Sequence, residues 1–161
     1  MKMRLQHFML VLFVCLGSSC SKESLETTDD IGTIVAKNNT VVEEELLNIV
    51  NDHRLSIGVN TLEFSEEAYV EANAHNDYMI SKGSLSHDNF SSRASKIAAA
   101  VDVEYIAENV ARNFDTASGA YGNWLASTSH KNTMEGDFTH TAVSVKIDAE
   151  GKLYFTQLFY R

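Results

Sequence analysis

The chain has 161 residues, of which 44% are hydrophobic and 22% are charged. This length suits one globular domain with a short extension and excludes two full-sized domains, because domains usually contain about 100 to 200 residues. The formal net charge of −9 at pH 7 argues against a nucleic-acid-binding protein. That affinity depends on Lys and Arg side chains that neutralise phosphates.

The N-terminal segment predicts export from the cytoplasm. Two basic residues, Lys2 and Arg4, precede the nine-residue apolar run FMLVLFVCL, and three small residues then lead to Cys20. This order is typical of a secretory signal peptide. The apolar run is about half as long as a membrane-spanning helix requires. Residues 1–19 are therefore predicted to be a cleaved signal peptide.

The small residues that end at Cys20 resemble the lipobox of bacterial lipoproteins, in which the cysteine becomes the acylated first residue of the mature protein. Gly17 stands where that motif usually has leucine, with Leu16 one place earlier. We expect a lipid on Cys20 that attaches the protein to a membrane, on the periplasmic side or at the cell surface; ordinary secretion is the alternative. Mass spectrometry of the exported protein checks this expectation, and an unmodified Cys20 would contradict it.

The residues after Cys20 change in character. From Ser21 to about Thr40 the sequence is polar and acidic and has no sustained apolar period. Such a composition is typical of a flexible spacer. We predict a linker over residues 20–41 and a folded domain over residues 42–161.

The first half of the folded part has helical periodicity. Leu46 and Val50 belong to an apolar stripe that ends before Gly58, and Ser65 is a suitable N-cap for a second helix that Gly83 would end. The segment between residues 83 and 93 has the composition of a loop. The predicted helices cover residues 41–57, 65–82, 94–101 and 115–130.

The last part of the chain changes to a period of two. Apolar and polar residues alternate over residues 141–147, a turn follows at residues 148–151, and residues 152–160 alternate again. This pattern predicts a β-hairpin. Helices followed by strands predict an α+β fold in which the helices pack on an antiparallel sheet.

Six short motifs follow one another in the folded part. They are Asn51-x-x-Arg54-x-x-x-Gly58, Ala72-x-x-His75-x-x-x-Met79, Ser86-His87 with Arg93 six residues later, Glu108-Asn109-Val110, Trp124-x-x-Ser127-x-x-His130 and Tyr154-Phe155-Thr156-Gln157. Together they resemble a bacterial CAP domain, of the superfamily also called SCP/TAPS, over about residues 42–161. The resemblance implies an α-β-α sandwich, which agrees with the order of elements above.

The resemblance also implies a cleft with a set of histidines and glutamates. His87 and Glu108 match the first His and the first Glu of the superfamily's His/Glu tetrad, and His130 belongs to the Trp-x-x-Ser-x-x-His pattern of the bacterial subgroup. The position of the second Glu is Ser127, and the position of the second His is Tyr154. Half of the tetrad is therefore replaced in this chain.

His87, Glu108 and His130 are 21 and 22 residues apart, so only the fold can bring them together. Two imidazoles and a carboxylate could hold a divalent metal such as Zn²⁺ or Ca²⁺ with one coordination position open, or could relay protons. Ser127 and Tyr154 are secondary candidates, as a nucleophile and as a hydroxyl that lines the cleft. Each side chain could instead brace a loop. His75 lies on an apolar helix face and is interpreted as a hydrogen-bonded core histidine.

The sequence is compatible with three functions. The first is a binding module whose cleft holds a small apolar or envelope-derived ligand. The second is a metal-dependent or acid/base hydrolase of peptide or envelope substrates, because members of the superfamily have been suggested to be proteases. The third is a surface interaction platform. The chain has neither HExxH nor G-x-S-x-G, which favours the binding module, expected to be a monomer.

Overall fold

A computed structural model describes residues 36–161 of the chain. The predicted signal peptide, the predicted lipidation site Cys20 and most of the predicted linker lie outside the described residues. The elements are β1 (Lys37–Asn38), α1 (Thr40–Ser56), β2 (Glu63–Phe64), α2 (Glu66–Lys82), α3 (Phe90–Ala100), β3 (Ile106–Arg112), α4 (Ala117–Ala126), α5 (Thr128–Met134), β4 (His140–Ile147) and β5 (Leu153–Tyr160).

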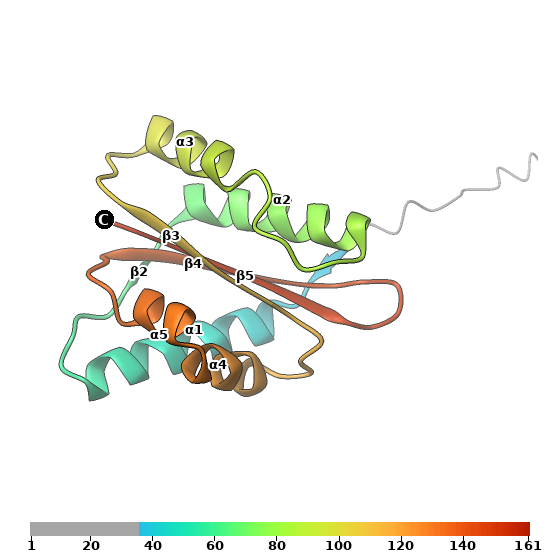
Figure 1. The fold of residues 1–161 in the computed structure, drawn as a ribbon, viewed down its shortest axis with the longest axis horizontal. Helices are drawn as coiled ribbons and strands as arrows, with labels where there is room; N and C mark the ends of the chain where they lie inside the picture. Colours follow the sequence, from blue (N-terminus) through green and yellow to red (C-terminus); the bar gives the residue numbers. More distant parts are fainter. Residues whose placement is uncertain (1–35) are drawn as a thin grey trace, which may run out of the picture. The chain divides into compact units, whose positions relative to one another are not determined.

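The described part of the chain has three layers, with one sheet between two layers of helices (Figure 1). Helices α2 and α3 cover one face of the sheet, and α1, α4 and α5 cover the other. The strand order is β1-β4-β5-β3, with β2 pairing beside β4, so β3 forms an edge of the sheet. All pairs are antiparallel except the short pair of β2 with β4. The predicted α+β sandwich is confirmed.

The core is divided between the two faces of the sheet because successive side chains of a strand point to opposite sides. On the side of α1 and α4, the buried rings of Trp124, Phe155 and Phe159 pack together. On the side of α2, Leu158 packs against the small helix residue Ala72. Every residue of β5 is buried, so the C-terminal strand forms the middle of the domain.

The predicted helices and the hairpin are found close to the expected positions. Ser65 caps α2 by accepting a hydrogen bond from the main-chain N–H of Ala68, and Gly83 ends the helix in the left-handed conformation at φ 62°. A left-handed residue at this position favours glycine, which has no Cβ to clash. Within residues 36–161, no helix combines the length and apolar character that crossing a bilayer requires.

Three expectations about the elements differ from the structure, and one long strand was not predicted. The linker ends earlier than residue 41, because residues 37–38 form β1 and Asn39 caps α1 through a bond from the N–H of Val42. Helix α3 begins at Phe90, inside the predicted loop. The single helix expected over residues 115–130 is two helices, because Ser127 between them is extended at φ −97° and ψ 120°. Strand β3 was not predicted.

Candidate functional site

Glu108 is the centre of the candidate site. It lies on β3, and its side chain, which is 2% exposed, faces the α2/α3 layer together with its strand neighbours Ile106 and Val110. The buried Arg93 of α3 binds the carboxylate with a two-pronged contact: Nε donates to Oε2 at 2.9 Å and Nη2 donates to Oε1 at 2.8 Å. Such paired bonds fix both the position and the plane of a carboxylate.

His87 adds an exposed imidazole to this ion pair. It lies in the loop between α2 and α3, and its Nδ1 is 2.9 Å from Oε1 of Glu108. An imidazole nitrogen this close to a carboxylate donates a hydrogen bond, which orients the ring. The side chain remains 55% exposed. Since Nδ1 is engaged, Nε2 is the ring atom that His87 offers to a ligand.

His75 of α2 lies on the buried side of the same carboxylate. Its Nε2 is 2.7 Å from the main-chain oxygen of Ser86 and 3.8 Å from Oε1 of Glu108, and its side chain is not exposed. The expected core histidine is therefore found, next to the site. Burial lowers the pKa of His75, although the negative charge of Glu108 acts in the opposite direction. The bond to Ser86 holds the loop that carries His87.

His130 approaches from the other helical layer. It lies on α5, and its main-chain oxygen accepts a bond from Nδ2 of Asn109 at 3.0 Å, so β3 itself positions this helix. Burial lowers the pKa of His130, and positive charge on His87 lowers it further. The two imidazoles therefore interact electrostatically from opposite sides of the edge strand. Nδ1 of His130 is buried without a partner among the described residues.

Ser127 and Tyr154 lie elsewhere. Ser127 is at the junction of α4 and α5, where its hydroxyl is 3.2 Å from the hydroxyl of Ser129. Tyr154 is fully buried and pairs with Arg112, four positions along β3 from Glu108, and the guanidinium of Arg112 lies 4.8 Å from its ring centre. The structure therefore brings His87 and Glu108 together, with His130 nearby, but joins neither secondary candidate to them.

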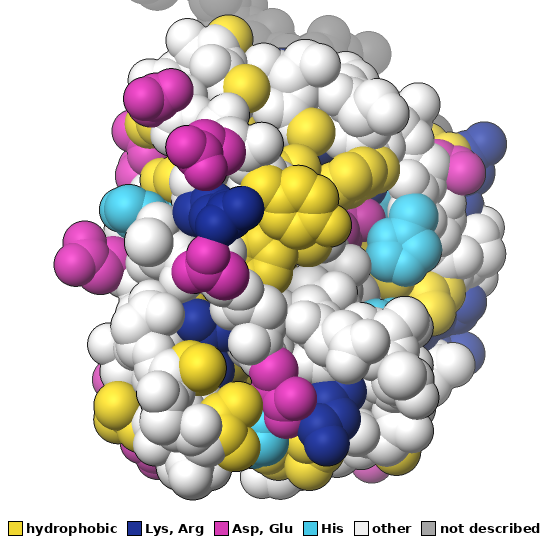
Figure 2. All heavy atoms as spheres, turned by 60° about the vertical axis from the view of Figure 1, so that its left-hand side comes forward, with side chains coloured by type: hydrophobic (Ala, Val, Ile, Leu, Met, Phe, Trp, Pro, Cys, Tyr) yellow, Lys and Arg dark blue, Asp and Glu magenta, His cyan; other side chains and the backbone are white. Residues whose placement is uncertain are grey.

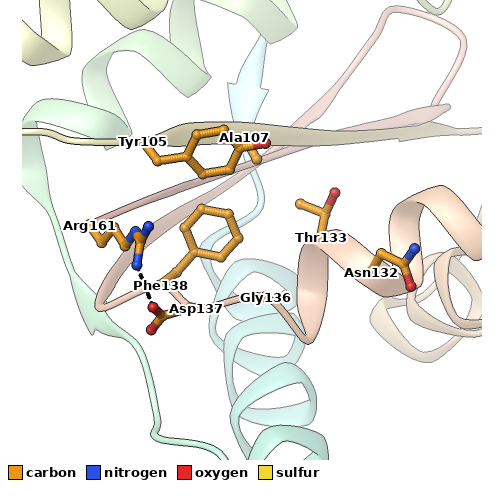
Figure 3. A pocket seen from close by; sticks show the side chains of 8 residues that line it. All are labelled: Tyr105, Ala107, Asn132, Thr133, Gly136, Asp137, Phe138 and Arg161. Atoms are coloured by element: carbon orange, nitrogen blue, oxygen red, sulfur yellow. Dashed lines mark hydrogen bonds and ion pairs between the residues drawn. The ribbon is translucent and has the colours of Figure 1, made fainter.

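A cavity of about 250 Å³ opens beside the His87–Glu108 pair. Its walls combine these two polar residues with mostly apolar ones, and the lining residues are His87, Phe90, Tyr105, Ile106, Ala107, Glu108 and Thr133. A second cavity of about 280 Å³ adjoins it and shares Tyr105, Ala107 and Thr133. In the second cavity the ring of Phe138 lies opposite Tyr105 and Ala107, and Thr133 closes the side toward α5 (Figure 3).

The residues present do not fit a divalent metal. Within residues 36–161, no group of three or more His, Cys, Asp or Glu side chains is arranged to hold a metal ion. Both oxygens of Glu108 already accept bonds from Arg93, whose positive charge also opposes a cation. The metal site predicted at His87, Glu108 and His130 therefore lacks a suitable ligand set. The chemistry of this site is that of a fixed ion pair with an imidazole attached.

Two members of this arrangement, His75 and Arg93, were not among the predicted site residues. Both stood in the recognised motifs, but a histidine on an apolar helix stripe has the same sequence signal whether or not a carboxylate lies beside it. Arg93 lies 15 residues before Glu108, and nothing local relates the two. The available signal was the motif that places Arg93 six residues after His87.

The buried histidines predict a loss of stability in mild acid. The pKa of His75 in the folded protein lies below its unfolded value of about 6.5, so below that pH the unfolded chain binds a proton that the folded chain does not. The free energy of unfolding should fall as the pH drops from about 6.5 toward the folded pKa, by at most about 1.4 kcal/mol per pH unit from this group. Urea unfolding at several pH values measures the slope, and His75→Gln should reduce it; an unchanged slope would contradict the assignment.

The chain is similar to known proteins over most of its folded part. A family model described as CAP, cysteine-rich secretory protein family, matches residues 47–159. The uncharacterized membrane protein YlbC of Bacillus subtilis (strain 168) is 27% identical over 129 residues, which cover 78% of this chain and 36% of YlbC. The chain therefore spans about a third of the length of that relative.

Solved structures share the fold. An outer surface protein from Borrelia burgdorferi has a TM-score of 0.70 at 16% identity, with 78% of this chain and 96% of that chain covered. An extracellular protein from Bacillus anthracis str. Ames that contains an SCP domain has a TM-score of 0.66 at 20% identity, covering 76% and 41%. A cysteine-rich secretory protein from Staphylococcus aureus has a TM-score of 0.63 at 19% identity, covering 76% and 39%.

Proposed function

Because this chain belongs to the cysteine-rich secretory protein (CAP) family, we propose that it is an exported ligand-binding domain whose site is the cavity beside His87 and Glu108. The proposed ligand is a small apolar or envelope-derived molecule. The observation that carries the proposal is the composition of the cavity, in which one oriented polar pair lies among mostly apolar side chains. Ligand sites in proteins are commonly concave and mostly apolar, with a few fixed polar groups that set orientation.

Export and attachment to a membrane complete the proposal. The order of basic residues, apolar run and small residues before Cys20 supports a signal peptide of residues 1–19 and a lipid on Cys20. The structures that share the fold include an outer surface protein and an extracellular protein. On this proposal residues 20–35 connect the lipid to the folded domain.

The electrostatic state of the site supports binding more than metal-dependent chemistry. Arg93 neutralises Glu108 through two hydrogen bonds, and His87 takes a third on the same carboxylate. Glu108 is thereby held as a fixed acceptor for His87. The imidazole is the group left to contact a ligand, because more than half of its side chain is exposed.

The proposed function predicts that the protein purified from its native cell carries a ligand. A denatured extract analysed by mass spectrometry should contain one species in near-stoichiometric amount. His87→Ala should lower its occupancy at least tenfold, since the exposed imidazole supplies the polar contact. His140→Ala is the matched control, because that ring stacks on Tyr160 outside the cavity lining. A clean extract from the unaltered protein, or equal loss in both variants, would contradict the proposal.

One observation favours acid/base hydrolysis as the second candidate. A carboxylate that accepts a bond from Nδ1 of an imidazole leaves Nε2 able to take a proton, which is the arrangement of a general base. The same variants discriminate this function. Turnover of a peptide or envelope substrate that His87→Ala abolishes and His140→Ala preserves would favour the hydrolase. Turnover that persists in His87→Ala would exclude this histidine as its base.

A further inference from the structure

The edge strand β3 has unpaired main-chain groups beside the cavities. Tyr105 and Arg161 exchange both of their main-chain hydrogen bonds, at 3.3 and 3.1 Å, which fixes the register of β3 against β5. In an antiparallel pair, such exchanging residues alternate with residues whose N–H and C=O point away from the partner strand. The N–H and C=O groups of Ile106 and Glu108 therefore point outward, away from β5.

The exposure of Glu108 shows that this edge is open. Its side chain is 2% exposed, yet the residue as a whole is half-buried, so its main chain supplies the exposed surface. Ile106 and Ala107 are also half-buried. Farther along the strand the edge is closed, because the indole Nε1 of Trp124 donates to the main-chain oxygen of Val110 at 3.0 Å. The open part is thus limited to a few residues before this closed end.

The open edge lacks several of the features that usually keep another strand away. Proteins usually protect edge strands with lysine, proline, a bulge or a covering segment. Residues 106–108 contain no lysine or proline, and their pairing with β5 is regular. The inward-pointing charge of Glu108, a feature that can itself protect an edge, is neutralised here by Arg93. Figure 2 shows hydrophobic side chains gathered in a hollow of this face, with charged side chains on one side and a histidine on the other.

The two cavities lie where the side chains of an added strand would point. Even-numbered residues of β3 face the α3 side, where the first cavity reaches Phe90 and His87. Odd-numbered residues face the α5 side, where the second cavity is lined by Phe138. An extended chain beside β3 would place alternate side chains toward the two cavities. Its end near Glu108 would meet Nε2 of His87, where a carboxylate complements an imidazole that can carry positive charge.

We propose that the ligand of this site is a peptide with a free carboxyl terminus, bound in extended form as an added strand along residues 106–108 of β3. This inference rests on the proposed function and names the class of its envelope-derived ligand. Main-chain hydrogen bonds to Ile106 and Glu108 supply the general attraction, and apolar side chains in the two cavities supply selectivity. Its carboxyl terminus lies beside His87 at the Glu108 end, and Trp124 closes the edge beyond that point, so the peptide runs parallel to β3.

Hydrogen exchange of the full chain, resolved to single amides, tests the proposal. The probe is acetyl-Ala-Leu-Ala-Leu with a free carboxylate, at millimolar concentration. It should slow exchange of the Ile106 and Glu108 amides at least tenfold. The amides of Ala107 and Asn109 are internal controls, because the register already directs them to β5, and they should change little. Protection that is equal at all four positions would overturn the proposal.

Two further arms separate main-chain recognition from simple apolar contact. Ile106→Pro removes one outward N–H without removing a bond to β5, and proline is tolerated where an edge N–H faces solvent. It should weaken probe binding at least fivefold relative to Ile106→Val, which keeps the N–H and much of the side chain. A probe that is N-methylated throughout, or that ends in a carboxamide, should bind at least fivefold more weakly to the unaltered protein. Equal binding of all probes would overturn the proposal.

The outcomes distinguish this inference from the function on which it rests. A native ligand that depends on His87, together with no protection of the Ile106 and Glu108 amides by the probe, would overturn the strand-addition inference alone. If the native protein carries no ligand and the probe protects no amide, both the proposed function and the strand-addition inference are overturned. Protection that rises with protein concentration in the absence of probe would replace the peptide by a second copy of this chain.

Discussion

Arg54→Ala is expected to lower the free energy of unfolding by about 3 to 5 kcal/mol. The side chain of Arg54 is completely buried at the end of α1. Its guanidinium donates hydrogen bonds to main-chain oxygens instead of pairing with a carboxylate. Nε donates to Asn60 at 2.8 Å, and Nη1 donates to Met134 at 2.7 Å and to Gly136 at 2.9 Å. Removing it leaves several buried acceptors without a donor and leaves a cavity behind.

The measurement is urea or thermal unfolding of Arg54→Ala beside Arg161→Ala. Arg161 is a suitable control because it is 42% exposed and pairs with Asp137, close to the segment that Arg54 holds. Exposed ion pairs usually contribute less than about 1 kcal/mol. The two variants should therefore differ by at least about 2 kcal/mol. Equal stability of the two would show that the bonds from Arg54 do not hold α1 to the chain around Gly136.

Glu108→Gln is expected to lower the free energy of unfolding by about 3 kcal/mol, so Glu108 has a structural role as well as a place in the candidate site. The substitution leaves the guanidinium of Arg93, which is 6% exposed, as a buried charge without its counter-charge. Breaking one side of a buried ion pair costs more than exchanging both sides for uncharged groups. A loss of activity in Glu108→Gln would therefore combine the removal of a site carboxylate with the destabilisation of the fold.

A double-mutant cycle measures the coupling of the pair. Arg93→Met alone should also destabilise, because Glu108 loses its guanidinium partner and the main-chain oxygen of Asp88 loses a bond. The double variant Arg93→Met/Glu108→Gln should be more stable than the sum of the two single effects implies, by at least about 1 kcal/mol. Strict additivity would mean that the two groups do not interact as the structure shows. For functional tests His87→Ala is preferable, since that side chain is mostly exposed.

The strongly periodic elements of the fold could be predicted from the sequence. The second helix has an N-cap at Ser65 and a stop at Gly83, and the hairpin has strict alternation on both sides of its turn. β3 gave no such pattern, because its sequence IAENVAR places Glu108 and Asn109 next to each other in mid-strand. The two side chains point to opposite faces of the sheet, where Glu108 binds Arg93 and Asn109 binds α5. A strand whose central residues are both polar has neither the alternation nor the apolar run that identifies a strand.

The candidate site was predictable only as far as the family resemblance reached. That resemblance named His87 and Glu108, which the structure brings to 2.9 Å from each other. It did not indicate that Arg93 donates to both oxygens of that carboxylate. The break at Ser127 was also missed, since both flanking segments favour helix and only the extended backbone of one residue separates them. Long-range packing, not local propensity, places α5 beside β3.

The position at which the chain joins the sheet bears on how the domain is presented to its surroundings. Lys37 pairs with Ile147 at the hairpin end of β4, whereas the open edge at Ile106 pairs with Tyr160, the partner of His140 at the other end of β4. The length of that strand, roughly 25 Å, separates the two ends. The chain therefore enters the sheet at Lys37, at the end remote from the open edge. A strand added at residues 106–108 would leave the pairing of Lys37 with Ile147 undisturbed.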